Sequence, residues 1–540
     1  MIDATPLLRL YACRRARRLA NEDTAAIQEA ILRRLVARAA RTRFGRDHGF
    51  AGIRDRSGFQ QAVPLRRYED FWAEYWSPAF PRLVDCSWPG EIPFFAATSG
   101  TTTGNTKFIP VTRAMIRSNR QAGLDLLVHH LTNRPCSRVF GGRNLLLGGS
   151  TALVERAPGV RSGDLSGIAA ATIPRWARPY AFPPPDIARL TDWTDKMARL
   201  VERAPQAQLR SISGTPSWLL LLFDELARRH PDRPPLLASF FPDLELIVHG
   251  GVNFAPYRAR FAEWLAGSRA ELRDAYAASE GFIAAADRGP EEGLRVNAAH
   301  GIFYEFVPVE EVDRAAPTRH WLGNVEPGID YAIVVTSCAG LWAFMLGDTV
   351  RFVARRPPRL LVTGRLSYTL SAFGEHLIGE EIEAAVAEAA AALAAGVRDF
   401  AVGAVFPERA GELGGHLFFV EFERPVGEAE LRGFAHRLDR GLAARNLDYR
   451  DHRAGGFGLR APEVHALPQG GFAEWMQRRG RLGAQNKVPR VINDRQLFAD
   501  LRGFAAARSG ARPVAAGPPQ AVPERDHQQN EQAADRDLGR

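Results

Sequence analysis

The stretch Thr98-Ser99-Gly100-Thr101-Thr102-Thr103-Gly104-Asn105-Thr106-Lys107 is the most informative segment of this 540-residue chain. Most of its residues are Gly, Ser or Thr, and a lysine closes it. Glycines let a backbone bend closely around an anion, while backbone N–H groups, hydroxyls and a lysine can bind phosphate oxygens. The apolar run Ile92–Ala97 comes directly before it. The segment therefore predicts a strand followed by a phosphate-binding loop, with a plain surface loop as the alternative.

This loop differs from the P-loop of common nucleotide hydrolases. That motif requires Gly-Lys followed at once by Ser or Thr, whereas Lys107 stands three residues after Gly104. The sequence therefore predicts a phosphate site of another class.

On both sides of the loop, the chain alternates between short apolar runs and helical patterns. Residues 1–92 favour helices, and strands alternate with helices from about residue 93 to residue 365. This arrangement is typical of an α/β fold in which helices flank β-sheets. The candidate strands are Asn144–Leu147, Leu244–Val248, Ile302–Val307, Tyr331–Thr336, Leu341–Met345 and Leu360–Val362.

The pattern starts again after Gly364. Ile378, Ile382 and Val386 recur at helical spacing, and further candidate strands follow, which predicts a smaller α+β domain. We therefore expect a large N-terminal domain at residues 1–365 and a small C-terminal domain at 366–510. Residues 511–540, rich in Ala, Pro, Gln and Asp, predict a disordered tail.

Composition favours a globular protein of the cytoplasm, with 46% hydrophobic and 24% charged residues. No run approaches the roughly 18 apolar residues that a membrane span needs. The first arginines follow the apolar residues Leu7–Leu10, which is the reverse of the order in a signal peptide. The four cysteines are far apart, which argues against a zinc site or disulfides. They are Cys13, Cys86, Cys136 and Cys338.

The net charge of +9 raises the question of nucleic-acid binding. Much of the excess lies within residues 1–45, where arginines occupy the solvated face of a helix predicted for Thr24–Ala40. No aromatic residues interleave with them, as stacking on single strands requires. The sequence therefore predicts neither a nucleic-acid surface nor a membrane surface.

The Gly/Ser/Thr loop and its flanks, Phe94–Thr112, resemble the nucleotide-binding motif of the adenylate-forming superfamily. The resemblance is closest to one branch of this superfamily, the auxin-responsive acyl-acid amido synthetases and their bacterial members. Thr42–Gly45 and Val63–Glu69 are similar to the bacterial members as well. Four more segments follow in the order that the family requires, so the resemblance extends over about residues 25–500. They are Tyr276–Gly281, Leu346–Asp348, Gly364–Arg365 with Gly374–Glu375 and Glu380–Glu383, and Gln485–Arg490.

The resemblance implies that these segments bind ATP and Mg²⁺. Tyr276 would pack on the adenine, Glu280 would hold Mg²⁺, and Asp348 would bind the ribose hydroxyls. Gly250 and Gly251 follow a predicted strand, where they either back the adenine or form a plain turn at the end of the strand. The other ATP-binding candidates are Thr98, Ser99, Gly100, Thr101, Thr102, Thr103, Gly104 and Arg365.

Three residues are catalytic candidates. Lys107 and Lys487 would supply positive charge to the phosphates. His376 stands where many plant members carry a lysine, and it is either a base for the amine or a structural histidine. Ser367 replaces the usual hinge aspartate, which puts the pivot of the mobile small domain, near Arg365–Ser367, in question.

The acid pocket is predicted around Ser213–Trp218, with Thr215 and Trp218 as substrate contacts. Trp176 and Tyr180 are further candidates for the same pocket. The apolar residues Leu219–Phe223 that follow are better explained as core.

The resemblance implies an ATP-dependent acyl-acid amido synthetase. Such an enzyme forms an acyl-AMP from a carboxylic acid, releases pyrophosphate and transfers the acyl group to an amine such as an amino acid. An acyl-CoA ligase, or another ligase that uses an acyl-adenylate, is the alternative, and a non-catalytic binding scaffold is a third. We expect small-molecule substrates and no obligate protein partner.

Other motifs do not compete with this interpretation. Gly456–Ala461 fits a dinucleotide fingerprint by letter, but no strand is predicted before it. No Gly-x-Ser-x-Gly motif occurs, so a serine hydrolase lacks support. The histidines do not have the His-Glu-x-x-His spacing of zinc proteases either.

Overall fold

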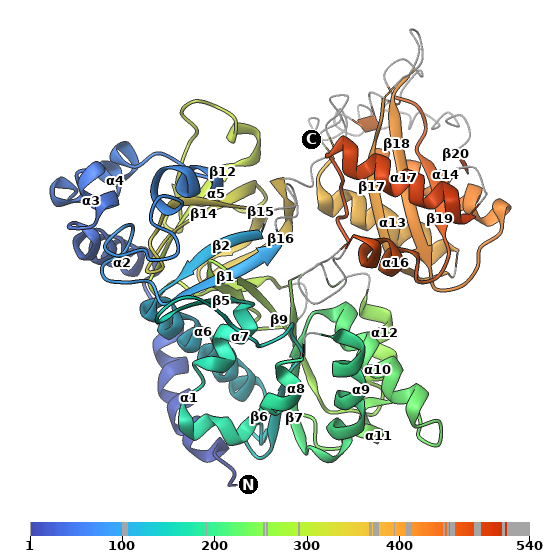
Figure 1. Cartoon of the computed structure of the whole chain (residues 1–540), viewed down its shortest axis with the longest axis horizontal. Coiled ribbons are helices and arrows are strands. Elements are labelled where there is room, and N and C mark those ends of the chain that lie inside the picture. The colour runs from blue at the N-terminus through green and yellow to red at the C-terminus, as the bar shows by residue number, and fades with distance from the viewer. Residues whose placement is uncertain are drawn as a thin grey trace, which may run out of the picture.

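The structure is a computed structural model with a large N-terminal domain and a smaller C-terminal domain (Figure 1). A twelve-stranded sheet and a four-stranded sheet form the large domain, and a third sheet forms the small one. The described residues are 2–99, 106–190, 192–251, 254, 257–289, 292–366, 370, 377–393, 395–406, 413–446, 449–450, 453, 459–479, 488–509 and 514–515.

The twelve-stranded sheet has the order β13-β12-β14-β15-β16-β11-β10-β9-β8-β7-β3-β6. Neighbours are antiparallel from β13 to β9 and parallel from β9 to β6. The strands are β3 (Arg143–Leu146), β6 (Ala181–Phe182), β7 (Leu209–Gly214), β8 (Leu246–Gly250), β9 (Glu271–Ala278), β10 (Gly281–Ala285), β11 (Leu294–Val296), β12 (Ile302–Pro308), β13 (His320–Trp321), β14 (Asp330–Ser337), β15 (Leu341–Arg355) and β16 (Pro358–Arg365).

The second sheet has the order β2-β1-β5-β4 and holds both flanks of the predicted phosphate loop. Its strands are β1 (Phe94–Ser99), β2 (Thr106–Val111), β4 (Val154–Ala157) and β5 (Val160–Gly163). β1 and β2 are antiparallel, with Thr98 opposite Lys107. The strand predicted before the loop is therefore confirmed.

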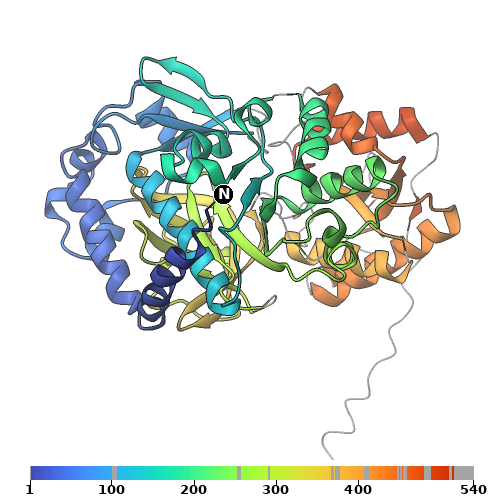
Figure 2. The same ribbon diagram turned by 90° about the horizontal axis from the view of Figure 1, so that it is seen from below.

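Helices α1–α5 form the first part of the large domain, as the helical patterns of residues 1–92 predicted. Helices α6–α12 connect the strands or cover the sheets (Figures 1 and 2). Side-chain caps begin several of them. Thr112, for example, accepts a hydrogen bond from the backbone N–H of Met115 at 3.0 Å. The helices are α1 (Thr5–Ala20), α2 (Thr24–Ala39), α3 (Arg43–Asp47), α4 (Arg56–Ala62), α5 (Tyr68–Phe71), α6 (Arg113–Asn133), α7 (Leu165–Ala171), α8 (Pro185–Ala188), α9 (Trp193–Arg203), α10 (Pro216–Arg229), α11 (Leu237–Phe240) and α12 (Arg258–Trp264). Shorter helical turns lie at Phe50–Gly52, Trp72–Trp76, Arg175–Tyr180, Ala204–Gln206 and Val309–Glu311.

Three apolar cores hold the large domain together, and the smallest joins α1 and α6 to β8, β9 and β10. The first joins the antiparallel half of the sheet to the N-terminal helices and includes the fully buried Trp76 and Trp342. The second joins the parallel half to α9–α12. Leu219, Leu220, Leu222 and Phe223 of α10 belong to this core, as predicted, although Leu221 is 49% exposed.

In the small domain, helices cover both faces of the sheet β17-β18-β19-β20. α13 and α14 pack on one face, and α16 and α17 pack on the other. The strands are β17 (Val397–Val405), β18 (Gly415–Phe422), β19 (Glu463–Leu467) and β20 (Val514–Ala515), and the helices are α13 (Gly379–Ala392), α14 (Glu428–Arg445), α16 (Gly471–Arg478) and α17 (Arg495–Ser509).

The predicted α/β fold class, with a large and a small domain, is confirmed. The exact boundaries at 1–365 and 366–510 stay predictions. β20 pairs with β19 inside the stretch predicted as a tail, so the sheet extends past residue 510; the other residues of 511–540 lie outside the described ranges. No described helix is long and apolar enough to span a membrane.

A buried ionic contact fastens α1 to α6. The carboxylate of Asp125, only 2% exposed, accepts hydrogen bonds from Arg15 Nε at 2.9 Å and Nη2 at 2.7 Å. His300 Nε2 lies 2.7 Å from the same carboxylate. Burial by itself raises the pKa of Asp125, but the hydrogen bonds from Arg15 and His300 outweigh burial and lower this pKa to about 2.

We expect Asp125→Asn to lower the free energy of unfolding by about 3 kcal/mol at pH 7, because Arg15 is left without its buried partner. The folded-state pKa lies below the ordinary value of 3.8, so this contribution is complete above about pH 4 and declines toward pH 2. Urea unfolding of both proteins across this pH range measures it. A difference that persists unchanged at pH 2 would contradict the assignment.

Candidate nucleotide-binding site

The sheet changes direction at β9, which is parallel to β8 and antiparallel to β10. In open sheets with parallel strands, ligands bind beyond the carboxyl ends of the strands. Gly214 ends β7, Gly250 ends β8, and Glu280 follows β9. The predicted site residues of these three strands therefore share one edge of the sheet.

Tyr276, Asp348 and Arg365 meet at this switch although they are far apart in sequence. Asp348 on β15 lies directly opposite Arg365 on β16. Arg365 Nε is 2.8 Å from Asp348 Oδ1, and Tyr276 Oη donates a hydrogen bond to Asp348 Oδ2 at 2.6 Å. The carboxylate predicted to bind ribose is thus held from both sides.

A bulge in β15 sets the direction of Asp348. The pairing of β15 with β14 shifts register between Met345 and Thr349, and Gly347 has a φ of +85°. Glycine adopts this conformation without strain, and such bulges redirect the side chain that follows. The prediction of a strand at Leu341–Met345 was therefore too short, because β15 continues through the bulge to Arg355.

Glu280 is partly buried beyond the end of β9. Its burial, followed by the neighbouring charge of Asp348, raises its pKa to about 7, against the opposing influence of Arg365 and Lys107. These charges therefore lie within electrostatic range of one another. A buried carboxylate with a raised pKa fits a cation ligand, because a bound cation would stabilise the ionised form.

A magnesium ion bound at this place would have few ligands from the protein. The described residues contain no group of three or more His, Cys, Asp or Glu side chains placed to hold a metal. Mg²⁺ is commonly held by one or two carboxylates together with substrate phosphates. Glu280 and, beside it, Asp348 are the acidic groups available here.

Tyr276 and Gly250 have structural reasons for their identity. Tyr276 is 7% exposed, and its hydroxyl is committed to Asp348. A Cβ on Gly250 would stand 2.0 Å from the carbonyl oxygen of Ala275, so only glycine allows β8 and β9 to lie this close. Gly251, with a φ of +80°, begins the loop beyond β8.

Lys107 has two partners that the sequence analysis did not assign. Its Nζ is 2.7 Å from Glu69 Oε1 and lies 4.9 Å from the centre of the Tyr68 ring. The Tyr68 hydroxyl accepts a hydrogen bond from the N–H of Phe108 at 2.9 Å. In the sequence, only the similarity of Val63–Glu69 to the bacterial family members pointed to this segment. That similarity did not indicate that Tyr68 and Glu69 contact Lys107.

Several predicted residues cannot be placed. The backbones of Thr98 and Ser99 end β1, but their side chains are not described. Gly100, Thr101, Thr102, Thr103, Gly104, Ser367, His376 and Lys487 lie outside the described residues. Their roles stay predictions.

The four predicted substrate contacts are not brought together. Thr215 begins α10 at the carboxyl end of β7, and its buried Oγ1 has no hydrogen-bond partner among the described residues. Trp218, in the first turn of α10, packs partly buried on the second core. Trp176 is 65% exposed. Tyr180 comes before β6 and therefore lies at the opposite, amino edge of the parallel strands.

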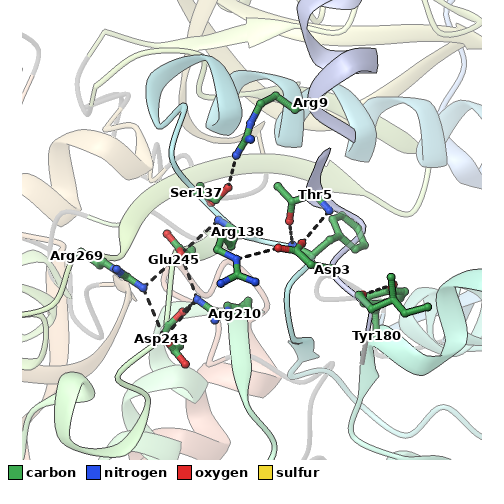
Figure 3. A network of polar contacts seen from close by, with 12 residues as sticks. Asp3, Thr5, Arg9, Ser137, Arg138, Tyr180, Arg210, Asp243, Glu245 and Arg269 are labelled. Atoms are coloured by element: carbon green, nitrogen blue, oxygen red, sulfur yellow. Dashed lines mark hydrogen bonds and ion pairs between the residues drawn. The ribbon is translucent and has the colours of Figure 1, made fainter. Parts of the chain in front are cut away.

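Figure 3 shows what Tyr180 does there. Its hydroxyl donates a hydrogen bond to the carbonyl oxygen of Ile2 at 2.7 Å. Beside it, Arg138 Nε donates to Asp3 Oδ2 at 2.8 Å, and its backbone N–H reaches Glu245. This network anchors the N-terminal segment to the amino edge of the sheet.

Three family models match the chain: "GH3 family N-terminal domain" at residues 15–200, "GH3 family central domain" at 296–365 and "GH3 family C-terminal domain" at 380–496. The chain belongs to the GH3 family. The boundaries of these matches agree with the division between the twelve-stranded sheet and the small domain.

Two curated relatives of this GH3-family chain come from Oryza sativa subsp. japonica. "Jasmonoyl--L-amino acid synthetase GH3.5" is 27% identical over 262 residues, which cover 45% of this chain and 44% of the relative. "Probable indole-3-acetic acid-amido synthetase GH3.4" is 27% identical over 223 residues, covering 38% of this chain and 35% of the relative. The match thus spans less than half the length of either relative.

Two solved structures share the fold over nearly the whole chain. "GH3.15 acyl acid amido synthetase" superposes with a TM-score of 0.76 at 19% identity, covering 94% of this chain and 97% of the other. A 2-hydroxyisobutyryl-CoA ligase in the postadenylation state, in complex with 2-HIB-AMP, gives a TM-score of 0.59 at 19% identity, covering 90% and 93%.

We expect Tyr276→Phe to weaken ATP binding about five- to tenfold, because the Asp348 carboxylate loses one of its two holding contacts. Isothermal titration calorimetry with a non-hydrolysable ATP analogue measures it. Tyr304→Phe is the matched control, since this buried tyrosine of β12 makes only long hydrogen bonds, outside the site. Equal affinities for the wild type and Tyr276→Phe would contradict a role of this hydroxyl in positioning Asp348.

We expect Glu280→Gln to raise the melting temperature at pH 8. Because the folded-state pKa of Glu280 is about 7, above the ordinary 4.5, its ionisation destabilises the folded state increasingly as pH rises from 4.5 to 7. Removing the charge should stabilise the protein by up to about 3 kcal/mol near pH 8 and by nothing near pH 4.5.

Differential scanning calorimetry at both pH values tests this expectation. Glu202→Gln, on the exposed face of α9, is the matched control and should leave the melting temperature unchanged. A lower melting temperature for Glu280→Gln at pH 8 would show that Glu280 is stabilised as an anion without a metal.

Proposed function

We propose that this GH3-family chain is an ATP-dependent acyl-acid amido synthetase. It converts a carboxylic acid and ATP into acyl-AMP and pyrophosphate, and then transfers the acyl group to an amine, with release of AMP. The convergence of Lys107, on β2 of the four-stranded sheet, with Glu280, Asp348 and Arg365 of the twelve-stranded sheet carries the proposal. Two cations and two acidic groups at one place suit a nucleotide bound with a divalent cation.

In the first half-reaction, a carboxylate oxygen attacks the α-phosphorus of ATP and the bond to pyrophosphate breaks. Both reactants are anions, so cations must screen their repulsion. Lys107 lies beside the phosphate loop, and Arg365 lies beside Asp348, the ribose ligand. Magnesium would be held by Glu280 and the ATP phosphates, where it would neutralise charge. The loop residues Thr98–Gly104 supply hydroxyls and N–H groups to the phosphates.

In the second half-reaction, the amine nitrogen attacks the acyl carbon, loses a proton, and AMP leaves as the amide forms. Lys487 belongs to the adenylation step and His376 is the candidate base for the amine. The small domain changes orientation between the steps, with its pivot near Arg365–Ser367. Shielding of the acyl-AMP from water is the reason for such a movement.

Lysine usage supports the assignment of the phosphate contacts. Only three of the 70 lysines and arginines in the chain are lysines: Lys107, Lys196 and Lys487. Two of these three stand in the predicted phosphate-contacting motifs. A lysine presents a compact charge on a flexible stem, which a planar guanidinium does not reproduce.

The names of relatives indicate the substrate class. The two rice relatives are named for jasmonoyl–amino acid and indole-3-acetic acid–amide synthesis. A second solved GH3.15 structure, with a TM-score of 0.78, is a complex with 2,4-DB. We propose a small carboxylic acid with an apolar body, an amino acid as the acceptor, ATP and Mg²⁺ as cofactors, and the cytoplasm as the compartment.

An acyl-CoA ligase is the second candidate function, favoured by the shared fold of the 2-hydroxyisobutyryl-CoA ligase. The matches to three GH3 family models favour the amide. A hydrolase is disfavoured even though Ser137, His130 and Glu271 form a hydrogen-bonded chain. The serine is only 3% exposed and the histidine is fully buried, so no substrate reaches this group.

The test is acid-dependent exchange of labelled pyrophosphate into ATP with a panel of aryl, indole and fatty acids. We expect exchange with one acid class, reduced at least about a hundredfold in Lys107→Ala, because a positioned charge on the phosphates is lost. Exchange with no acid, together with no ATP binding, would refute the enzymatic function.

The acceptor is then tested with the acid identified by exchange. Amide formation with a panel of amino acids is compared with thioester formation with coenzyme A. A thioester without any amide would establish the second candidate.

A further inference from the structure

The small domain contacts the large domain at the first turn of α12. Arg490 Nη2 lies 3.5 Å from Tyr257 Oη, and Arg260 Nη1 lies 3.7 Å from Glu423 Oε1. Tyr257 caps α12 and Arg260 follows three residues later, so both face the same side of the helix. Figure 1 shows α12 directly below the small domain.

On the small-domain side, Arg490 is held rigidly. Its guanidinium lies 2.5 Å from Asp399 and 4.5 Å from the centre of the Phe400 ring. Its carbonyl oxygen accepts a hydrogen bond from the N–H of Val402 at 2.8 Å, and Val491 forms a parallel bridge with Val402. Arg490 therefore moves together with β17 whenever the small domain moves.

On the large-domain side, Tyr257 closes the connection that begins at Gly250 and Gly251. Its N–H donates to the carbonyl oxygen of Phe254 at 2.9 Å. The Phe254 ring stacks on His249 of β8, with ring centres 3.9 Å apart. Phe254 is thus packed against β8, which ends at Gly250, the first of the two glycines predicted to back the adenine.

Arg260 has its own anchor in the large domain. Its Nη2 lies 2.6 Å from Asp224 of α10, at the same time as Nη1 faces Glu423. The side chain is therefore already ordered, and little further side-chain entropy is lost when the small domain docks.

We propose that Tyr257 and Arg260 form a docking site for the small domain, through Arg490 and Glu423, and that the docked orientation serves adenylation. This inference rests on the proposed two-step function. Arg490 ends the segment Gln485–Arg490, which the family resemblance connects with the nucleotide. Its contact with Tyr257 brings the end of that segment to the connection after Gly250 and Gly251. Tyr257 and Arg260 are positioning residues and do not touch the reacting atoms.

The strength of the docking contacts suits a movement that repeats in every turnover. The Arg260–Glu423 pair is about one-third exposed on each side, 31% and 35%, and partly exposed pairs of this kind contribute little. The Arg490–Tyr257 hydrogen bond is long at 3.5 Å. Contacts of this kind bias the orientation of the small domain without locking it.

Cross-linking tests the docking in the full chain. Arg260→Cys and Glu423→Cys are combined, in a background in which the exposed Cys13 and Cys136 are changed to serine. A short bis-maleimide that a thiol can cleave then joins the pair. The mismatched control pairs Glu423→Cys with Arg18→Cys, which lies on α1, outside the proposed docking site. We expect at least roughly tenfold faster cross-linking of the first pair, because docking raises the effective concentration of the two thiols.

Tyr257→Phe sharpens this test. Added to the Arg260→Cys/Glu423→Cys pair, it should slow cross-linking at least about threefold while the melting temperature stays unchanged, because only a hydroxyl between the domains is lost. Equal cross-linking rates for the matched and mismatched pairs overturn the docking site, whatever the activity of the protein.

Activity of the linked protein then tests the orientation. We expect the cross-linked protein to keep acid-dependent pyrophosphate exchange, to lose amide formation at least about tenfold, and to recover it when the linker is cleaved. Loss of exchange in the linked protein, or amide formation at the unlinked rate, overturns the assignment to adenylation. If the unlinked protein has neither activity, the proposed function is refuted, and the assignment of the docked orientation to adenylation is refuted with it. The cross-linking rates still decide whether docking occurs.

Discussion

The reversal of strand direction at β9 is the constraint on which the site depends. Because β9 is parallel to β8 and antiparallel to β10, the carboxyl ends of the parallel strands open next to the antiparallel half of the same sheet. Tyr276 and Glu280 come from the switch strand and the turn after it, whereas Asp348 and Arg365 come from the antiparallel half. The single hydrogen bond from Tyr276 to Asp348 joins these two sources.

The charges around this edge suit the proposed binding of anions together with a divalent cation. Asp348 is compensated by Arg365, and Lys107 by Glu69, whereas Glu280 is left with a raised pKa. A chain that uses arginine almost everywhere keeps lysine at Lys107. The third lysine, Lys196, is 2% exposed and donates hydrogen bonds to the carbonyl oxygens of Gly148, Gly149 and Ala188. A compact ammonium group with three hydrogen-bond donors fits these three carbonyl oxygens. The lysine at position 196 is therefore explained by structure, without a catalytic role.

The proposed two-step chemistry requires a small domain that is positioned precisely and released readily. The contacts described between α12 and the small domain are few, polar and partly exposed, as expected for an interface that forms and breaks. In sequence, they follow closely after Gly250 and Gly251, the glycines predicted to back the adenine. The proposed docking site and the predicted nucleotide site are therefore only a few residues apart in the chain.

The resemblance to the family supplied the order of the motifs that contain Tyr276, Glu280, Asp348 and Arg365. The sequence alone determined the fold class and the strand before the predicted phosphate loop. These two features are local, because glycines at tight turns and apolar periodicity act over a few residues. The sequence did not reveal the position of Tyr180. This residue was predicted to line the acid pocket, but its hydroxyl bonds to Ile2 at the amino edge of the parallel strands.

Only the tertiary structure decided which groups meet across the fold. Glu69 reaches Lys107, Tyr276 reaches Asp348, and Arg490 reaches Tyr257 over 38, 72 and 233 residues of chain. It also decided the length of β15, which continues through the bulge at Gly347 to Arg355. Such contacts depend on strand order and register, which are set when distant strands pair and bury their apolar faces together, and no local pattern encodes that pairing.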